Sequence, residues 1–255
     1  MNITASIQAR IGSSRLPGKV LKDICGKPML QWQVERLLRS SLVDNVVVAT
    51  TTNSIDDRIE DFCDNLGFSC YRGSEEDVLG RIAGLVRDLK VDLHVECYGD
   101  SPLIDPQIVD EFIGYFLKHA DYCDYVSSAL KTTYPPGLEV TLYTGSVLLE
   151  TNVLVAHNDP LREHAGYNVT RFSERYRLIS LEAPPYYHYP DTYLEVDTKE
   201  DLEVIRAVIG HFAVRDQGHF TLSQILDMVR DNPDLMSRND DVERRWKALR
   251  NQVDV

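Results

Sequence analysis

The chain has 255 residues, with 27 Lys and Arg against 40 Asp and Glu, so its formal net charge at pH 7 is −13. This balance argues against a nucleic-acid binder, because such proteins gain affinity by neutralising phosphates with a surplus of basic side chains. Hydrophobic residues make up 43% of the chain and no run of about 18 apolar residues occurs, so we expect a globular, cytoplasmic protein without a membrane segment.

Short apolar runs alternate with amphipathic stretches over the first 130 residues, a rhythm typical of βαβ units around a parallel sheet. The predicted strands cover residues 3–8, 46–50, 69–72, 93–98 and 122–128. The predicted helices cover residues 28–40, 56–66 and 78–89 and a stretch that begins at Pro106. We therefore predict an α/β fold with a Rossmann-like, mostly parallel sheet flanked by helices.

The rhythm changes at Lys131, where a Pro-rich turn interrupts the chain and a strand-like run at 138–143 follows. Residues 131–190 show no clean βα repeat, so we expect an inserted arm or lid. The main domain, residues 1–213, is expected to resume after this arm with a strand at 193–196 and a helix at 199–212 that is capped by Asp197 or Thr198. Residues 214–255 are expected to form a helical extension, with helices at 222–230 and 240–252.

The loop after the first predicted strand carries the strongest chemical signal. It reads Gln8-Ala9-Arg10-Ile11-Gly12-Ser13-Ser14-Arg15-Leu16-Pro17-Gly18-Lys19 and lies in a segment, residues 1–40, with seven basic and two acidic side chains. Small residues let backbone N–H groups approach a phosphate, while Arg10, Arg15 and Lys19 supply positive charge. The spacing matches neither a P-loop nor a G-x-G-x-x-G dinucleotide motif. We predict a polyphosphate site rather than a solvated surface turn.

A second candidate follows the predicted strand at 93–98, where Asp100 can point into the crevice at the carboxyl edge of the sheet. Mg²⁺ takes oxygen ligands, usually one or two carboxylates together with phosphate oxygens. Asp100 is therefore the first candidate metal ligand, although an Asp before Ser-Pro is also a common turn residue. Asp197, at the end of the last predicted strand, is the second candidate, and it serves equally well as a helix cap.

The loop, together with Gly26-Lys27-Pro28-Met29-Leu30, resembles the signature of sugar nucleotidyltransferases, in particular the cytidylyltransferases that make CMP-activated acidic sugars. Within these the chain is most similar to the spore-coat-polysaccharide-type cytidylyltransferase family, which is related to CMP-sialate and CMP-KDO synthetases. Supporting segments are 49–51, 72–81, 99–106, 162–164 and 197–202, so the resemblance extends from residue 3 to about residue 209. It implies a Rossmann-like fold, CTP as donor, Mg²⁺ as cofactor and pyrophosphate as leaving group.

The resemblance also implies roles for individual residues. Arg15, Lys19 and Asp100 are the expected catalytic residues, and Asp100 and Asp197 are the expected metal ligands. The expected nucleotide-binding residues are Ala9, Arg10, Gly12, Ser13, Lys27, Asp77 and Arg81. The expected acceptor-binding residues are Glu139, Arg162 and His164, since a cation suits an acidic acceptor and a histidine can transfer a proton near neutral pH.

The acceptor is the least defined part of this hypothesis. Relatives that make sugar-acid products often carry an Arg, or a Gln next to the Gly, where this chain has Glu96-Cys97-Tyr98, and a negative residue there does not favour an anionic acceptor. The leading expectation is CMP transfer to a small acidic sugar of the nonulosonic or 3-deoxy-ulosonic type for surface glycan biosynthesis, by a homodimer. The alternatives are a phosphate or phosphonate acceptor, and a non-catalytic nucleotide-binding subunit.

Overall fold

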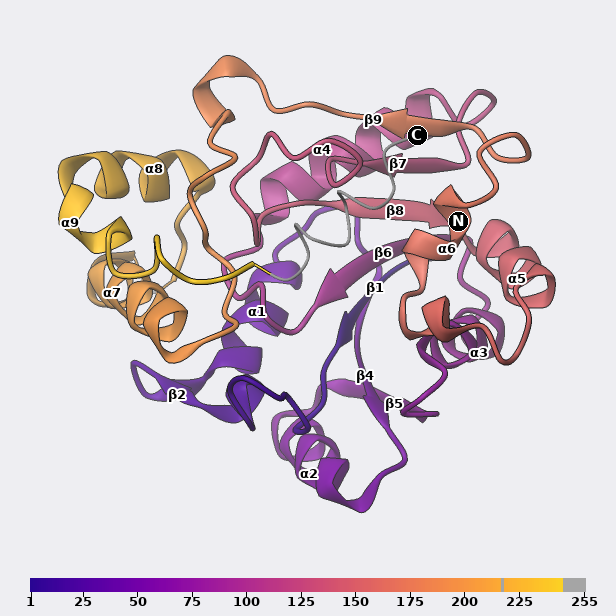
Figure 1. Cartoon of the computed structure of the whole chain (residues 1–255), viewed down its shortest axis with the longest axis horizontal. Coiled ribbons are helices and arrows are strands. Elements are labelled where there is room, and N and C mark those ends of the chain that lie inside the picture. Colours follow the sequence, from indigo (N-terminus) through magenta and orange to yellow (C-terminus); the bar gives the residue numbers. More distant parts are fainter. Residues whose placement is uncertain (217, 245–255) are drawn as a thin grey trace.

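The computed structural model describes residues 1–216 and 218–244. A seven-stranded sheet crosses the molecule in the order β5-β4-β1-β6-β8-β7-β9 (Figure 1). Its strands are β1 Ile3–Gln8, β4 Asn45–Thr51, β5 Ser69–Gly73, β6 Leu93–Tyr98, β7 Tyr125–Ser127, β8 Thr141–Thr144 and β9 Leu178–Ser180. Within this sheet β8 runs antiparallel to both of its neighbours, and the other pairings are parallel. A small hairpin joins β2 Asp23–Ile24 to β3 Lys27–Pro28.

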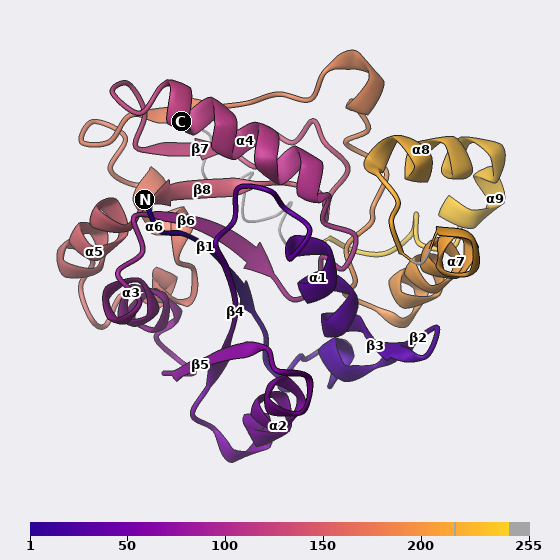
Figure 2. The same cartoon turned by 180° about the vertical axis from the view of Figure 1, so that it is seen from behind.

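Helices cover both faces of the sheet (Figures 1 and 2). One face packs against α1 Met29–Leu37, α2 Asp57–Leu66 and α4 Pro106–Lys118, and the other against α3 Val78–Asp88, α5 Gly145–Leu154 and α6 Gly166–Thr170. Because side chains alternate along a strand, each strand supplies both layers: Val46 and Val48 face the first core, while Val47 and Ala49 face the second. The mostly parallel α/β architecture expected from the sequence is confirmed.

The second face of the central strands is unusually polar. Ser6 Oγ on β1 lies 2.8 Å from His94 Nε2 on β6, and Gln8 Nε2 donates to Glu96 Oε1 at 2.7 Å. Glu96 is 3% exposed and also accepts the backbone N–H of Gly166, at the start of α6. Burial raises the pKa of the Glu96 carboxyl, against the lowering effect of these donors. Glu96 therefore fastens α6 to the sheet and does not face the crevice.

The first half of the chain follows the sequence prediction closely. The observed strands β1 and β6 have the predicted bounds, β4 is one residue longer than predicted at each end, and β5 is one residue longer at its C-terminal end. Gly67 ends α2 in the left-handed conformation, with φ 71°, and Asp77 caps α3 by accepting the N–H of Gly80 at 2.7 Å. Both caps depend on local backbone chemistry that a short window of sequence contains.

The prediction is wrong for parts of the second half. Residues 131–190 are not an arm outside the sheet, because β8 pairs with β6 and β7, and β9 pairs with β7. The predicted strand at 193–196 does not form: Leu194 and Val196 instead donate single backbone hydrogen bonds to Pro136 and Asp100, each 2.8 Å long. Short strands and isolated loop contacts depend on partners distant in sequence, which periodicity alone does not reveal.

The C-terminal part of the described chain packs beside the sheet rather than on it. It contains α7 Lys199–Asp216, α8 Leu222–Asp231 and α9 Pro233–Met236, which gather on one side of the molecule near β2 (Figure 1). The predicted helices at 199–212 and 222–230 are confirmed. The predicted helix at 240–252 is not formed over 240–244, and its remainder lies outside the described residues. No helix of the described chain is long and apolar enough to cross a membrane.

Candidate active site

The loop between β1 and α1 is built on a set of internal anchors. Ile11, Leu16 and Val20 are buried, at 5%, 3% and 2% exposure, while the intervening Gly and Ser residues stay near the surface. The carbonyl of Ile11 accepts hydrogen bonds from the N–H groups of Ser13 and Gly18, at 2.8 and 2.9 Å. Gly18 has a φ of 66°, a conformation that favours glycine. The apolar residues therefore fix the loop, and its polar residues remain available.

Asp56 fixes the same loop from the other side. Its side chain is buried, its Oδ1 accepts the N–H of Ile11 at 2.7 Å, and its Oδ2 accepts the hydroxyl of Thr51. In the sequence Asp56 is predicted only as the start of a helix, so this role is not evident there. Its position at the end of a strand-to-helix loop was the available signal.

Gly99 brings the end of β6 next to the loop. A Cβ at this position would lie 2.9 Å from the Gln8 carbonyl oxygen and 3.1 Å from the Val20 side chain, so any other residue would separate the two strand ends. The next residue, Asp100, consequently lies beside Lys19, with 3.3 Å between Asp100 Oδ2 and Lys19 Nζ. The carboxyl edge of the parallel sheet thus juxtaposes a carboxylate and the basic loop.

Asp197 approaches Lys19 from a third direction. Its Oδ1 lies 3.0 Å from Lys19 Nζ, its Oδ2 pairs with the Arg15 guanidinium, and Lys19 Nζ also donates to the carbonyl of Val196 at 2.7 Å. These four side chains, Arg15, Lys19, Asp100 and Asp197, are called the crevice cluster below. They are 23%, 12%, 30% and 15% exposed, respectively, so a ligand in the crevice can reach them.

The charge of Lys19 is maintained by the two carboxylates. Burial opposes the charged form, but Asp100 and Asp197 outweigh it and hold the pKa of Lys19 above its usual value of 10.5. Because both carboxylates contact one ammonium, their oxygens converge on a single point. Two converging carboxylates are a suitable partial ligand set for Mg²⁺, which completes its shell with phosphate oxygens or water. No cluster of three or more His, Cys, Asp or Glu able to hold a metal occurs among residues 1–216 and 218–244.

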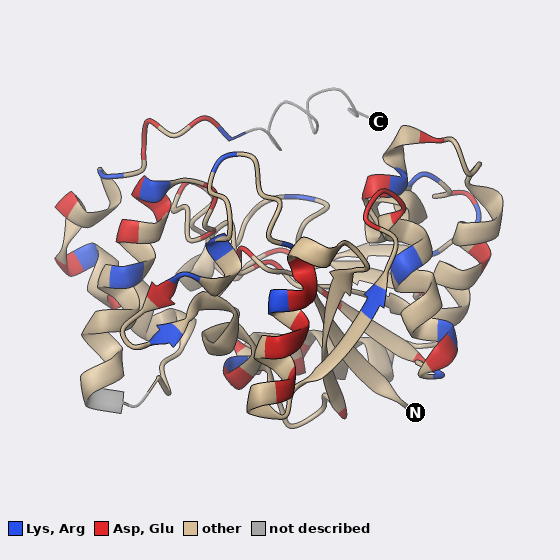
Figure 3. Ribbon diagram, turned by 90° about the horizontal axis from the view of Figure 1, so that it is seen from below, with Lys and Arg blue, Asp and Glu red and all other residues tan. Residues whose placement is uncertain are grey.

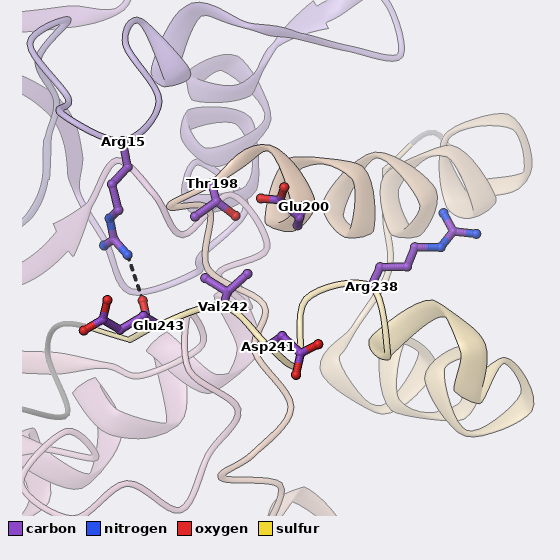
Figure 4. Close-up of a pocket in the computed structure, with 7 residues that line it drawn as sticks. All are labelled: Arg15, Thr198, Glu200, Arg238, Asp241, Val242 and Glu243. Atoms are coloured by element: carbon purple, nitrogen blue, oxygen red, sulfur yellow. Dashed lines mark hydrogen bonds between the residues drawn. The ribbon is translucent and has the colours of Figure 1, made fainter.

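The structure distinguishes the two roles that the sequence left open for Asp197. Thr198 caps α7 instead: its hydroxyl accepts the N–H of Asp201 at 3.4 Å, and the Asp201 carboxylate accepts the N–H of Thr198 at 2.9 Å. The side chain of Asp197 is consequently free of the cap and turns toward Lys19. Arg15 extends from the loop toward the C-terminal segment, where its Nη1 donates to the carbonyl of Glu243 at 3.1 Å (Figure 4).

A second group of expected residues lies on the other side of the loop. Arg10 Nη1 is 3.8 Å from Glu75 Oε1, and a Cβ on Gly12 would lie 3.7 Å from the same carboxylate oxygen. Arg81 is 5% exposed and donates to the carbonyl of Ser74. Burial lowers the pKa of Arg81, and the charge of Arg10 lowers it further. The loop and residues 74–81 therefore form one charged wall of the crevice.

Two expected residues have other partners. Lys27 Nζ pairs with Glu35 at 2.7 Å and lies over the Trp32 ring, 4.9 Å from its centroid, so no contact links it to the crevice cluster in the described chain. Asp77 forms a bidentate ion pair with Arg162, with both N–O distances at 2.9 Å, in addition to capping α3. Asp77 and Arg162 are called the buried pair below, after the arginine, because Arg162 is 3% exposed whereas Asp77 is 33% exposed.

Arg162 does not fit the expected role in acceptor binding. Its side chain is 3% exposed, and its five N–H groups donate to Asp77, to Asn152 and to the carbonyl of Val155. It therefore fastens the 3-10 turn Pro160–Glu163 to α3 and α5, and none of its N–H donors remains for a ligand. The sequence could not show this, because an exposed and a buried arginine look alike in a loop.

The other expected acceptor residues lie on separate segments. Glu139 accepts the N–H of Gly137 at 2.7 Å, in a loop that packs tightly against residues 194–195, just before Asp197. His164 is about one-third exposed, and its Nε2 lies 3.4 Å from Glu163. Glu139 thus lies on the Asp197 side of the site, while His164 belongs to the segment that leads into α6.

A pocket with a volume of about 510 Å³ adjoins the crevice cluster. It is lined by Arg15, Thr198, Glu200, Arg238, Asp241, Val242 and Glu243 (Figure 4). Charged side chains of both signs therefore meet beside the loop, and basic and acidic residues are similarly interspersed over much of the ribbon (Figure 3). The arrangement of loop, paired carboxylates and adjoining pocket suits a transfer reaction on a polyphosphate.

Comparisons with known proteins agree with this chemistry. The family model described as cytidylyltransferase matches residues 4–225. The spore coat polysaccharide biosynthesis protein SpsF of Bacillus subtilis is 33% identical over 233 residues, which cover 89% of this chain and 94% of SpsF. The 3-deoxy-manno-octulosonate cytidylyltransferase of Trichlorobacter lovleyi is 42% identical over 119 residues, 46% of each chain.

Solved structures show the same fold. A cytidylyltransferase from Leptospira borgpetersenii superposes with a TM-score of 0.87 at 28% identity, covering 96% of this chain and all of that one. The CMP:2-keto-3-deoxy-manno-octonic acid synthetase in complex with CTP superposes with a TM-score of 0.61 at 21% identity, covering 83% of this chain and 99% of that one. The match to the family model over most of the chain shows that this protein belongs to the cytidylyltransferase family.

Proposed function

We propose that this protein transfers CMP from CTP to a small acidic sugar of the nonulosonic or 3-deoxy-ulosonic type and releases pyrophosphate. The observation that carries this proposal is the crevice cluster, in which Lys19 and Arg15 meet Asp100 and Asp197 at the carboxyl edge of the sheet. Its support comes from the family and from relatives whose names state cytidylyl transfer to octulosonates. A role in surface glycan synthesis is supported by the name of SpsF.

In this mechanism an acceptor oxygen attacks the α-phosphorus of CTP. The new bond joins that oxygen to phosphorus, the bond between the α-phosphorus and the bridging oxygen breaks, and pyrophosphate leaves with the electron pair. Such a transfer requires positioning and charge neutralisation rather than a covalent enzyme intermediate. The loop N–H groups, Arg15 and Lys19 bind the β- and γ-phosphates and stabilise the charge that develops on the leaving group.

Asp100 and Asp197 are the residues that would hold Mg²⁺, since both carboxylates lie beside Lys19 and remain partly exposed. When bound, Mg²⁺ supplies polarisation of a phosphoryl oxygen and lowers the pKa of a coordinated hydroxyl. In this proposal Arg10, Gly12, Ser13 and Arg81 would bind the base and ribose. Glu139 and His164 would bind the acceptor.

A pyrophosphate-release screen tests the proposal. The four ribonucleoside triphosphates are crossed with acidic sugars and with phosphorylated small molecules, and products are identified by mass. Release that needs both CTP and an acidic sugar supports the proposal. A CDP-type or phosphonate-linked product would show that the acceptor is a phosphate or a phosphonate rather than an acidic sugar. Calorimetric binding of CTP without turnover on any acceptor would favour a nucleotide-binding subunit instead.

A further inference from the structure

The C-terminal segment Asn239–Arg244 lies against the site although it follows the residues that the family model matches, which end at 225. Glu243 accepts a hydrogen bond from Arg15 through its carbonyl, and Asp241 and Val242 line the adjoining pocket (Figure 4). The segment therefore reaches the phosphate-binding loop across more than 200 residues of sequence.

Arg244 anchors the segment. Its side chain is 2% exposed, its Nη2 donates to Asp201 Oδ1 at 2.8 Å, and its guanidinium lies over the Tyr193 ring, 4.3 Å from the centroid. Asn239 donates to the same Asp201 oxygen at 2.9 Å and to the carbonyl of Tyr193 at 3.1 Å. One oxygen of Asp201 is thus held entirely by donors from the C-terminal segment.

The other oxygen of Asp201 holds the backbone of the active site. Asp201 Oδ2 accepts the N–H groups of Asp197 and Thr198, at 3.0 and 2.9 Å. The Asp201 side chain is fully buried, so each of its hydrogen bonds replaces lost contact with water. The Asp201 carboxylate therefore links Arg244, on one of its oxygens, to the backbone of Asp197, on the other. A displacement of Arg244 would in this way reach the peptide that carries the Asp197 side chain.

We propose that Arg244 is a positioning residue for cytidylyl transfer, acting through Asp201 to orient Asp197 toward Lys19 and the triphosphate. This inference rests on the proposed function. Arg244 touches none of the reacting atoms, and its effect reaches them only through the Asp197 peptide. Loss of Arg244 leaves the buried Asp201 carboxylate short of a donor, so the turn at 197–198 relaxes and the Asp197 carboxylate leaves its place.

A double-mutant cycle on the full-length protein tests the proposal. Turnover is measured for Arg244→Ala, Asp197→Asn and the double variant, with Arg230→Ala as the control in the same C-terminal region. Arg230 suits this purpose because its side chain is 63% exposed and pairs with the equally exposed Asp227. We expect Arg244→Ala to lower kcat about 10- to 100-fold, the scale expected for a displaced catalytic group. In the Asp197→Asn background the same change should cost less than about twofold, because coupled residues are not additive.

A binding measurement without acceptor gives a second readout that does not depend on turnover. Calorimetry of CTP binding is run with Mg²⁺ and with EDTA. Arg244→Ala should reduce the gain in CTP affinity that Mg²⁺ provides, while the affinity in EDTA stays within about twofold of the unchanged protein. Equal losses in both conditions, or an undiminished cost of Arg244→Ala in the Asp197→Asn background, would show a merely structural role and overturn the proposal.

Two further variants protect the test against misfolding. If Arg244→Ala does not fold, Asn239→Ala removes the other donor to Asp201 Oδ1, and Arg244→Lys keeps the charge, so the same cycle is run with them. Arg244→Lys should recover most of the turnover, because it keeps the positive charge beside Asp201. If Arg244→Lys is as slow as Arg244→Ala but equally stable, the charge of Arg244 does not explain its effect. Absence of turnover in the unchanged protein on every acceptor refutes the proposed function, whereas normal turnover with additive variants refutes only the role of Arg244.

Discussion

The crevice cluster and the buried pair are made of the same side chains, aspartate with arginine or lysine, yet they differ in what remains available to a ligand. In the buried pair, Asp77 caps a helix and Arg162 uses all five N–H donors on protein groups. In the crevice cluster, a neighbouring threonine provides the cap, and Asp197 is left to pair with Lys19. The comparison teaches that the two regions differ in the exposure of their cations, which is 23% for Arg15 and 12% for Lys19 against 3% for Arg162, rather than in charge itself.

The largest effect that separates the two regions is expected at Asp100. Asp100→Asn removes a charge that pairs with Lys19 alone among the cations of the described chain, so the fold should tolerate it, while transition-state stabilisation is lost. Turnover should fall about 10²- to 10³-fold. Pyrophosphate release with saturating CTP and acceptor measures the fall, and a melting temperature within a few degrees of the unchanged protein serves as control. Turnover within a few fold would remove Asp100 from the machinery.

Breaking the buried pair should affect stability instead. Asp77→Ala leaves the guanidinium of Arg162 in the interior without its carboxylate, which is expected to lower the free energy of unfolding by about 3 kcal/mol. Urea denaturation measures the change. The matched control is Asp57→Ala, since Asp57 also pairs with an arginine but is 54% exposed, and its loss should cost less than about 1 kcal/mol. Similar costs for the two variants would show that burial does not distinguish them.

The pH dependence of stability should reveal the buried polar face of the sheet. Burial lowers the pKa of His94 from 6.5 to about 3, so the unfolded chain binds a proton that the folded chain does not. The stability that His94 contributes is complete above pH 6.5 and is lost as the pH falls toward 3, at about 1.4 kcal/mol per unit for one proton.

Urea titrations at several pH values measure this slope for the unchanged protein, for His94→Gln and for the exposed His157→Gln as control. The slope between pH 6 and pH 4 should become shallower by about one proton in His94→Gln and stay unchanged in the control. An equal slope in His94→Gln would show that other groups cause the acid sensitivity.

The smallest effect is expected where a pair is exposed. Arg10 and Glu75 are 54% and 37% exposed and 3.8 Å apart, so Glu75→Gln should change the free energy of unfolding by less than about 0.5 kcal/mol. The same urea assay at low and high salt measures it. A loss of more than about 1 kcal/mol in the free energy of unfolding would show that this exposed pair stabilises the fold as a buried pair does.

Much of the fold could be predicted because its signals are local. The strand at 3–8, the cap at Asp77 and the left-handed Gly67 each depend on a few adjacent residues. The loop at 9–19 and the carboxylate at 100 were identified in the same way, from their places at strand ends. The approach of Asp100 to this loop was expected from the rule that the carboxyl ends of parallel strands share one edge of the sheet.

The rest depended on contacts between distant segments. The sequence could not show that Arg162 is saturated by Asp77, that Lys27 pairs with Glu35, or that β8 enters the sheet between earlier strands. Asp201 does carry a readable signal, because the Thr198-x-x-Asp201 spacing is that of a capping box. Arg244 gave no local signal, because its partner lies 43 positions earlier.

The pairing within the crevice cluster has a consequence for encounter kinetics. Two cations and two carboxylates make the cluster neutral as a unit, and the chain around it carries a net charge of −13. A polyanionic substrate therefore meets a repulsive rather than an attractive long-range field, and its association rate should rise as added salt screens that repulsion. Attraction begins only at contact, when the phosphates reach Arg15 and Lys19. We therefore expect a slow association rate together with selectivity that arises at close range.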